Sequence, residues 1–238
     1  MSKDFIIAIE TSGRAGSAAV CTPEGEILEM PFSGMMKHSA ELFPTLHTLL
    51  DKAEGRPDNV GEVYITSGPG SFTGLRIAVT AAKMFHFAQQ VRIVSADTMD
   101  VIAENAVHEK SVDCIATVLD AKKGYFYAAV YDRTTTGWDK SFGTNMVRAE
   151  DLLGWLQTNN RNHVGLLGEG LLYYADQFKA PFTCILDESL WTARAARLIR
   201  VGQRMAAAGQ YTDPVTLTPT YIGLPDAVTV RQRKKDKS

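Results

Sequence analysis

The sequence has few cysteines and no long apolar run. Cys21, Cys114 and Cys184 are odd in number, far apart and set in apolar surroundings, which argues against a disulfide framework or a zinc site. We expect them to be buried thiols in a reducing compartment. No window approaches the roughly 20 apolar residues of a membrane span, and the N-terminus lacks a cationic start followed by a long apolar stretch. These absences predict a cytoplasmic protein that does not enter a membrane.

The chain also lacks a strong charge of either sign. Its 238 residues include 25 basic and 27 acidic ones, for a formal net charge of −2, so nothing draws the whole molecule to nucleic acid or to an anionic membrane. The basic tail from Arg231 to Lys237 is more typical of a solvated end than of a tRNA contact. With 45% hydrophobic residues, the chain is expected to fold around a substantial core.

The first half alternates strand-like and helical patterns. Three β-rich runs in the first thirty residues predict a β-meander, and a helix is expected from about Ser39, which is available as its cap. A strand, a glycine-rich loop and a helix from Phe72 to Ala88 follow, and then a further strand and a helix from Thr98. This order predicts an α/β unit.

The second half repeats the opening of the first. Residues 112–137 parallel residues 5–25 as strand, acidic residue, tight turn, strand and polar turn, with Glu10 matched by Asp120 and Gly16 by Gly124. This duplication predicts two similar lobes that face each other across a cleft. We expect lobes at 1–106 and 107–211, with an extended tail at 212–238. Helices are expected over about 149–157 and 190–208, and the second of these is a candidate to pack back on the first lobe.

The loop that ends in SGPGSFTG joins a strand to a helix. Backbone N–H groups at such a turn favour an anion, but the spacing fits neither of the two usual phosphate loops. On chemistry alone, a tight turn with close backbone packing is the better interpretation.

The helix after this loop is apolar almost all round. Its only charges are Arg76 and Lys83, and a helix of this kind must be covered on every side. One face can meet the sheet. The opposite face requires either the helix that carries Leu42, or a second protein, and the sequence leaves both possibilities open.

Catalytic patterns are sparse. The five histidines include no pair at helical spacing and none lies near a cysteine, so we expect no metal site. No Gly-x-Ser-x-Gly elbow occurs, and Ser71 is better explained as a helix cap than as a nucleophile. The hairpin turns after Glu10 and Asp120 remain as candidates to hold nucleotide phosphates and a metal, as two such turns do in actin-like ATPases.

Several segments, in order along almost the whole chain, match a known family: IAIETS, HSAELFPTL, SGPGSFTGLRIAV, LDAKKGYFYAAVY and PTYI. The sequence resembles the TsaB (YeaZ) family, the non-catalytic partner in bacterial synthesis of threonylcarbamoyladenosine on tRNA. The resemblance implies an actin-like (ASKHA, RNase H-like) α/β fold of two similar lobes, each opened by a β-meander. It also implies that the chain is not an enzyme on its own.

The same resemblance implies partners. The chain would form a homodimer in isolation, and would bind and activate TsaD, the catalytic subunit. TsaD transfers a threonylcarbamoyl group to N6 of the adenosine next to the anticodon in tRNAs that read ANN codons. TsaE, a P-loop ATPase, would join the complex, tRNA would be reached through it, and ATP or ADP and a metal would be bound by the partner subunits.

The resemblance places dimerisation on the two apolar helices of the first lobe. The residues predicted at this interface are Leu42, Leu46, Leu49, Phe72, Leu75, Ala78, Val79 and Ala82. The sequence departs from the family pattern in two places, with Glu10 where Asp is usual and Gly223 where Arg is common.

Two alternatives remain. The first is an ATP-binding actin-like enzyme or nucleotide switch, and the second, less favoured, is a peptidase. The residues predicted to hold the nucleotide in the first alternative are Glu10, Thr11, Ser12, Asp120, Lys122, Gly124 and Gly168.

Overall fold

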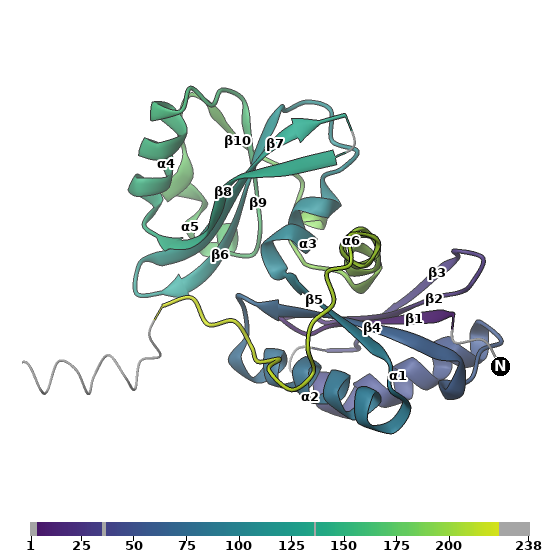
Figure 1. Cartoon of the computed structure of the whole chain (residues 1–238). Helices are drawn as coiled ribbons and strands as arrows, with labels where there is room; N and C mark the ends of the chain where they lie inside the picture. The colour runs from purple at the N-terminus through teal and green to yellow at the C-terminus, as the bar shows by residue number, and fades with distance from the viewer. Residues whose placement is uncertain (1–3, 35–36, 136, 224–238) are drawn as a thin grey trace, which may run out of the picture.

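A computed structural model describes residues 4–34, 37–135 and 137–223, which form two mixed five-stranded sheets (Figure 1). The first sheet has the order β3-β2-β1-β4-β5, with β1 at Phe5–Glu10, β2 at Ser17–Cys21, β3 at Ile27–Pro31, β4 at Val60–Gly68 and β5 at Arg92–Asp97. The second has the order β10-β9-β6-β7-β8, with β6 at Cys114–Lys122, β7 at Tyr125–Thr134, β8 at Gly137–Val147, β9 at Val164–Leu167 and β10 at Thr183–Ile185.

The two sheets share one topology. In each, the first three strands form an antiparallel meander. The fourth strand pairs in parallel with the first, and the fifth pairs in parallel with the fourth. Strand β6 therefore corresponds to β1, and β10 to β5. The duplication that the sequence suggested from one hairpin in each half extends to the whole sheet.

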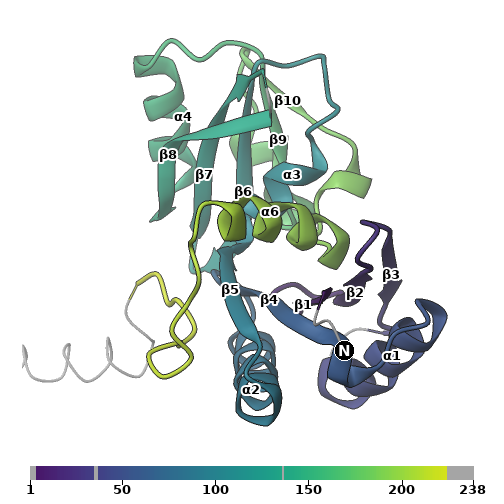
Figure 2. The same ribbon diagram turned by 45° about the vertical axis from the view of Figure 1, so that its right-hand side comes forward.

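The helices lie in three groups: outside the first sheet, between the two sheets, and beside the second sheet. Helices α1 (His38–Lys52) and α2 (Phe72–Gln89) lie on the outer face of the first sheet (Figure 1). Helices α3 (Thr98–Asn105) and α6 (Ala195–Ala207) lie between the two sheets (Figure 2), and α4 (Ala149–Thr158) and α5 (Leu171–Tyr174) lie beside the second sheet. Short 3₁₀ helices occupy Pro57–Asn59, Ala175–Phe178 and Glu188–Leu190.

The first sheet is buried on both faces, and strand β1 shows how. Its alternate residues point in opposite directions. Ile7 and Ile9 pack with α1 and α2 in one core, whereas Ala8 packs with α3, α6 and the second sheet in another. The inner core is therefore shared between the two halves of the chain.

Helix α6 is fixed at its start to the first sheet. The backbone N–H of Ala195 donates to Ser17 Oγ at 2.9 Å, that of Ala196 donates to Glu29 Oε1 at 3.1 Å, and the guanidinium of Arg194 pairs with Glu29. A helix from the second half of the sequence thus covers the first sheet. The lobe limits at residues 106 and 211 stay a prediction.

Three local expectations are wrong. Helix α6 begins at Ala195 and not near residue 190, because residues 188–190 form a separate 3₁₀ turn and Arg194 is extended. Lys37 takes the cap position expected for Ser39, and its side chain makes no capping hydrogen bond to the helix. Cys184 is exposed, since it lies in the short edge strand β10, whereas Cys21 and Cys114 are buried as expected.

The described chain ends in an extended segment, residues 210–223, which crosses the first lobe. Thr212 N donates to Ile93 O at 2.8 Å, Thr220 N donates to Ser67 O at 2.6 Å, and Leu217 is buried in the outer core. The basic residues from Arg231 to Lys237 lie outside the described residues. Among the helices within the described ranges, none is both long and apolar enough to cross a bilayer.

Candidate functional site

Seven of the eight residues predicted at the interface are turned inward in the structure, and their contact with a partner stays a prediction. Their side chains are buried within the chain itself, because they are the ones that α1 and α2 turn toward the sheet and toward each other: Leu42, Leu46, Leu49, Leu75, Ala78, Val79 and Ala82. Of the predicted set only Phe72 is half exposed. The sequence left open whether the helix that carries Leu42 or a second protein covers α2. In the structure, the helix that carries Leu42 covers one side of it.

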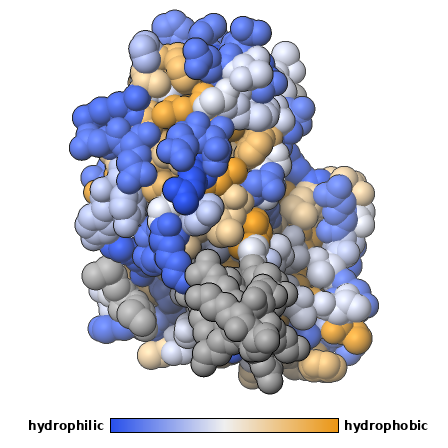
Figure 3. Space-filling model, turned by 90° about the vertical axis from the view of Figure 1, so that its left-hand side faces the viewer, coloured by the Kyte–Doolittle hydropathy of each residue, from blue (hydrophilic) through white to orange (hydrophobic). Residues whose placement is uncertain are grey.

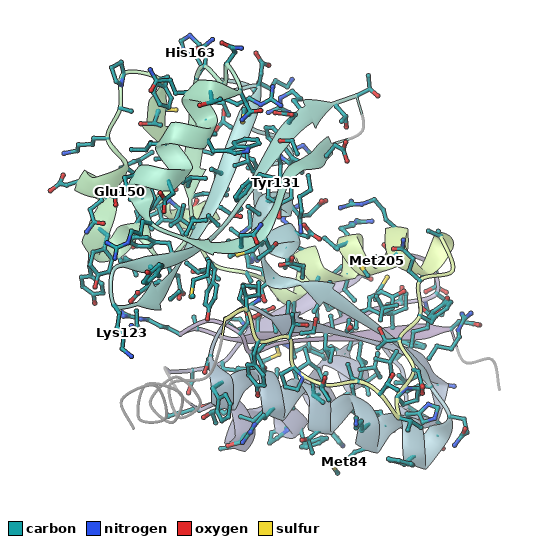
Figure 4. The ribbon with its side chains drawn as sticks, turned by 60° about the vertical axis from the view of Figure 1, so that its left-hand side comes forward. Met84, Lys123, Tyr131, Glu150, His163 and Met205 are labelled. Carbon is teal, nitrogen blue, oxygen red and sulfur yellow. The ribbon has the colours of Figure 1, made fainter. Side chains whose placement is uncertain are left out.

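The other side of α2 is only partly covered by the described residues, where Tyr221 stacks on Phe72 with the ring centroids 5.3 Å apart. Phe72, Met84 and Phe87 of α2 are 50%, 54% and 74% exposed, and Met84 points away from the sheet (Figure 4). Phe43 of the neighbouring α1 is 46% exposed. A groove of about 370 Å³ runs between α1 and α2, with Phe43, Phe72, Ile77 and Met84 among its lining residues. We call this surface the α1–α2 groove. Figure 3 shows hydrophobic groups at the lower edge of the molecule, at the height of these helices in Figure 1.

The start of α2 is fixed by the glycine-rich loop. Ser71 is the N-cap, as predicted, and its Oγ accepts from Gly74 N at 3.2 Å. Gly74 lies so close to β1 that an added Cβ would stand 1.8 Å from Thr11 O, and Thr11 Oγ1 donates back to Gly74 O at 2.7 Å. Glycine at this position therefore serves close packing of helix against strand.

A second cavity, of about 570 Å³, lies next to the groove and between the lobes. It is bounded by the β1–β2 turn, the start of α2, the β6–β7 hairpin and the segment that begins α5. Residues Ser39, Phe72, Thr73 and Ile77 line both this interlobe cleft and the α1–α2 groove. The two hollows are thus neighbours that share one wall.

Glu10 lies behind the cleft and is completely buried. Its Oε1 accepts from the backbone N–H of Ser12 at 2.6 Å and from the Ser12 hydroxyl at 2.5 Å, and its Oε2 has no hydrogen-bond partner among the described residues. Burial raises the pKa of the Glu10 carboxyl above its usual range. Glu10 and the buried Thr11 are absent from the cleft lining, whereas Ser12 contributes to it.

Asp120 and Lys122 line the cleft from the second lobe, but they are bound to each other. Asp120 accepts from Lys122 N at 2.7 Å and from Lys122 Nζ at 2.6 Å. Lys122 and Gly124 both have positive φ, at 69° and 76°, so the hairpin turns in the left-handed region, which glycine tolerates best. Gly124 and Gly168 do not line the cleft.

The cleft lining includes charged and aromatic residues that were not predicted from the sequence as site residues. Arg14 and His38 come from the first lobe and Glu169 and Tyr173 from the second, and all four line the cavity. The guanidinium of Arg14 reaches Tyr173 Oη at 3.1 Å and lies over the tyrosine ring. The Gly-Glu-Gly turn was the only sequence signal for this side of the cleft. Arg14 and Tyr173 are 159 residues apart along the chain, so no short-range pattern links them.

Comparisons with known proteins identify the family. A family model described as TsaD, tRNA N6-adenosine threonylcarbamoyltransferase, matches residues 30–213. The chain belongs to this family. Its curated relatives are named TsaB, a tRNA threonylcarbamoyladenosine biosynthesis protein, and the predicted membership of the TsaB (YeaZ) family is confirmed.

Two TsaB relatives show the range of similarity. The Bacillus subtilis protein is 29% identical over 126 residues, which are 53% of this chain and 54% of that protein. The matched region thus spans about half the length of that relative. The Escherichia coli protein is 22% identical over 218 residues, covering 91% of this chain and 94% of that protein.

Solved structures of the family have the same fold. YeaZ from Pseudomonas aeruginosa superimposes with a TM-score of 0.80 at 24% identity and covers 93% of this chain and 100% of its own. A second structure from that organism, described as similar to peptidase YeaZ, gives 0.81 at 23% identity, with 94% and 100% covered. Together with the repeated sheet order, this confirms the predicted fold of two similar lobes, each opened by a β-meander.

Proposed function

We propose that this chain is a non-catalytic scaffold subunit of the bacterial complex that adds a threonylcarbamoyl group to N6 of adenosine in tRNA. In this role it binds a TsaD-type catalytic subunit through the α1–α2 groove and activates it. TsaE, tRNA and the nucleotide and metal are engaged by the complex or by the partner subunits, and the chain in isolation pairs with a second copy of itself through the same groove.

The observation that carries the proposal is the set of exposed apolar side chains that α1 and α2 present within the described chain. Aromatic residues and methionine are enriched at protein interfaces, and Phe43 of α1 and Phe72, Met84 and Phe87 of α2 are exposed side chains of these kinds. The groove between the helices gives this face a concave centre, which suits an anchoring side chain from a partner. The match to the TsaD family model and the names of the relatives support a partner of TsaD type.

The test places a charge in the groove, at Met84, or beside it on α2, at Phe87, without disturbing the core, and we call these two substitutions the groove variants. Met84→Glu and Phe87→Glu change exposed side chains, and the matched control Leu172→Glu makes a similar change on α5 in the second lobe, where the side chain is 41% exposed. We expect the groove variants to lose co-purification with a TsaD-type subunit, and the control to keep it, because an unpaired charge in a desolvated contact is strongly unfavourable.

The proposal would be overturned if both groove variants co-purified with the TsaD-type subunit at wild-type yield. Ala78→Glu is not suitable for this test, since Ala78 is fully buried and the charge would unfold the chain.

A second candidate is a nucleotide-binding enzyme or switch, and the interlobe cleft is the observation that favours it. Both carboxylates predicted to hold the nucleotide are already engaged: Asp120, which lines the cleft, with Lys122, and Glu10, buried behind it, with Ser12. Calorimetry separates the two candidates: tight ATP binding by the isolated chain that is lost in Asp120→Ala would favour the nucleotide-binding role.

A further inference from the structure

The β1–β2 turn at the bottom of the interlobe cleft is contacted by a carboxylate from the opposite lobe. Glu169 Oε2 accepts from the backbone N–H of Arg14 at 3.4 Å. A Cβ built on Gly13 would stand 3.4 and 3.6 Å from the two Glu169 oxygens, so the whole carboxylate lies against this turn. Tight turns rich in free backbone N–H groups are anion-binding elements.

Two backbone N–H groups of this turn already donate hydrogen bonds to carboxylates of the chain itself. Ser12 N donates to Glu10 Oε1, and Arg14 N donates to Glu169 Oε2. The Arg14 guanidinium adds electrostatic attraction to Glu169. A phosphate that approached this turn would have to displace Glu169 and would meet its negative charge.

Glu169 is held in place by the backbone on either side of it. Gly168 has a φ of +123° and a Cβ there would stand 2.2 Å from Val118 O, while Gly170 N donates to Val118 O at 3.0 Å. Thr192 Oγ1 lies 3.5 Å from Glu169 Oε1. The two flanking glycines pack so tightly on β6 that the glutamate is presented to the opposite lobe from a fixed position.

We propose that Glu169 occupies the anion position of the interlobe cleft and thereby excludes phosphate-bearing ligands from the isolated chain. The charges that line the cleft support this assignment. Arg14 and Lys122 are balanced by Asp120 and Glu169, so that neutralising Glu169 leaves one net positive charge beside the turn. The contact lies within one chain, so it does not depend on the proposed partner.

The experiment measures pyrophosphate binding by isothermal titration calorimetry. Glu169→Gln keeps the shape of the side chain and removes its charge, and Glu169→Ala also vacates the turn. Glu150→Gln, an exposed glutamate on α4 (labelled in Figure 4), makes the same change in net charge away from the cleft and is the matched control. We expect both Glu169 variants to bind pyrophosphate at least tenfold more tightly than the wild type and Glu150→Gln.

A double variant, Glu169→Gln with Arg14→Ala, locates the new binding, because loss of Arg14 should cancel the gain. The proposal is overturned if folded Glu169→Gln binds pyrophosphate no more tightly than Glu150→Gln, or if the gain survives without Arg14. Since the groove variants leave the cleft unchanged, a failure here is distinguishable from a failure of the scaffold proposal.

Discussion

Single residues in this fold are constrained by contacts across long stretches of sequence. Gly74 is the clearest case, since an added methyl group would stand 1.8 Å from Thr11 O. We expect Gly74→Ala to lower the free energy of unfolding by more than about 3 kcal/mol, because the clash is with backbone and cannot be relieved by a rotamer change. Urea denaturation measures the loss.

Gly154 is the matched control, because it lies within α4 and an added Cβ meets nothing within 4 Å. Gly154→Ala should raise the free energy of unfolding by about 0.5–1 kcal/mol, the usual gain of alanine over glycine in a helix. Equal effects at the two positions would contradict this account of Gly74.

The buried Glu10 gives a pH dependence. Its pKa is raised in the folded chain, so between the unfolded and the folded value the folded state binds more protons, and stability falls as pH rises through that window. We expect Glu10→Gln to be less stable than or similar to the wild type at low pH and more stable at neutral pH. Each unit of raised pKa corresponds to about 1.4 kcal/mol.

Thermal unfolding of both proteins across the acidic to neutral range tests this expectation. A constant difference between the variant and the wild type at all pH values would show that Glu10 titrates normally.

At the scale of elements, the buried and the exposed apolar side chains of α1 and α2 have different roles. Leu46 of α1 is 2% exposed and packs in the outer core, whereas Phe87 of α2 faces outward. We expect Leu46→Ala to cost about 2–5 kcal/mol and Phe87→Ala less than about 0.5 kcal/mol in the free energy of unfolding. Chemical denaturation of the isolated variants, at a concentration where they are monomeric, gives both values.

The element scale also shows what could be predicted from the sequence. Strands and helices of the first lobe follow from hydrophobic period and turn residues, and α2 differs from its expected end by one residue. Which side of α2 is covered could not be predicted. A helix that is apolar all round carries no periodic signal to separate the side that meets the sheet from the side that stays free.

For the whole molecule, the lobes are joined by a charge cluster as well as by α6. Lys140 of β8 lies 2.9 Å from Asp97 Oδ2 and 2.7 Å from Asp100 Oδ1, which belong to the other half of the chain. All three side chains are largely shielded from solvent. We expect Lys140→Ala to lower the free energy of unfolding by about 1–3 kcal/mol, between the values for exposed and fully buried pairs.

Lys179→Ala is the control, because the Lys179–Asp176 pair is open to solvent and should contribute little to stability. Differential scanning calorimetry measures both. A loss for Lys140→Ala no larger than for the control would show that the cluster does not stabilise the junction.

At this scale the sequence predicted two lobes from one repeated hairpin, and the repeated sheet order confirms that architecture. The cleft contacts were beyond prediction, because Arg14 and Glu169 meet only when both lobes are folded and no short-range pattern links them. For the same reason Glu10 and Asp120, equivalent by sequence position, differ in the structure: the first is buried and the second lines a cavity.

The position of α6 has a consequence for synthesis of the protein. The inner face of the first sheet is closed by a helix that ends at residue 207, although strand β2 is complete at residue 21. At a translation rate of about 5–20 residues per second, the ribosome reaches that helix about 10 to 40 s later. During this interval α3 can cover only part of the inner face, and the emerging amino-terminal half exposes the alanine-rich apolar surface that α6 later closes.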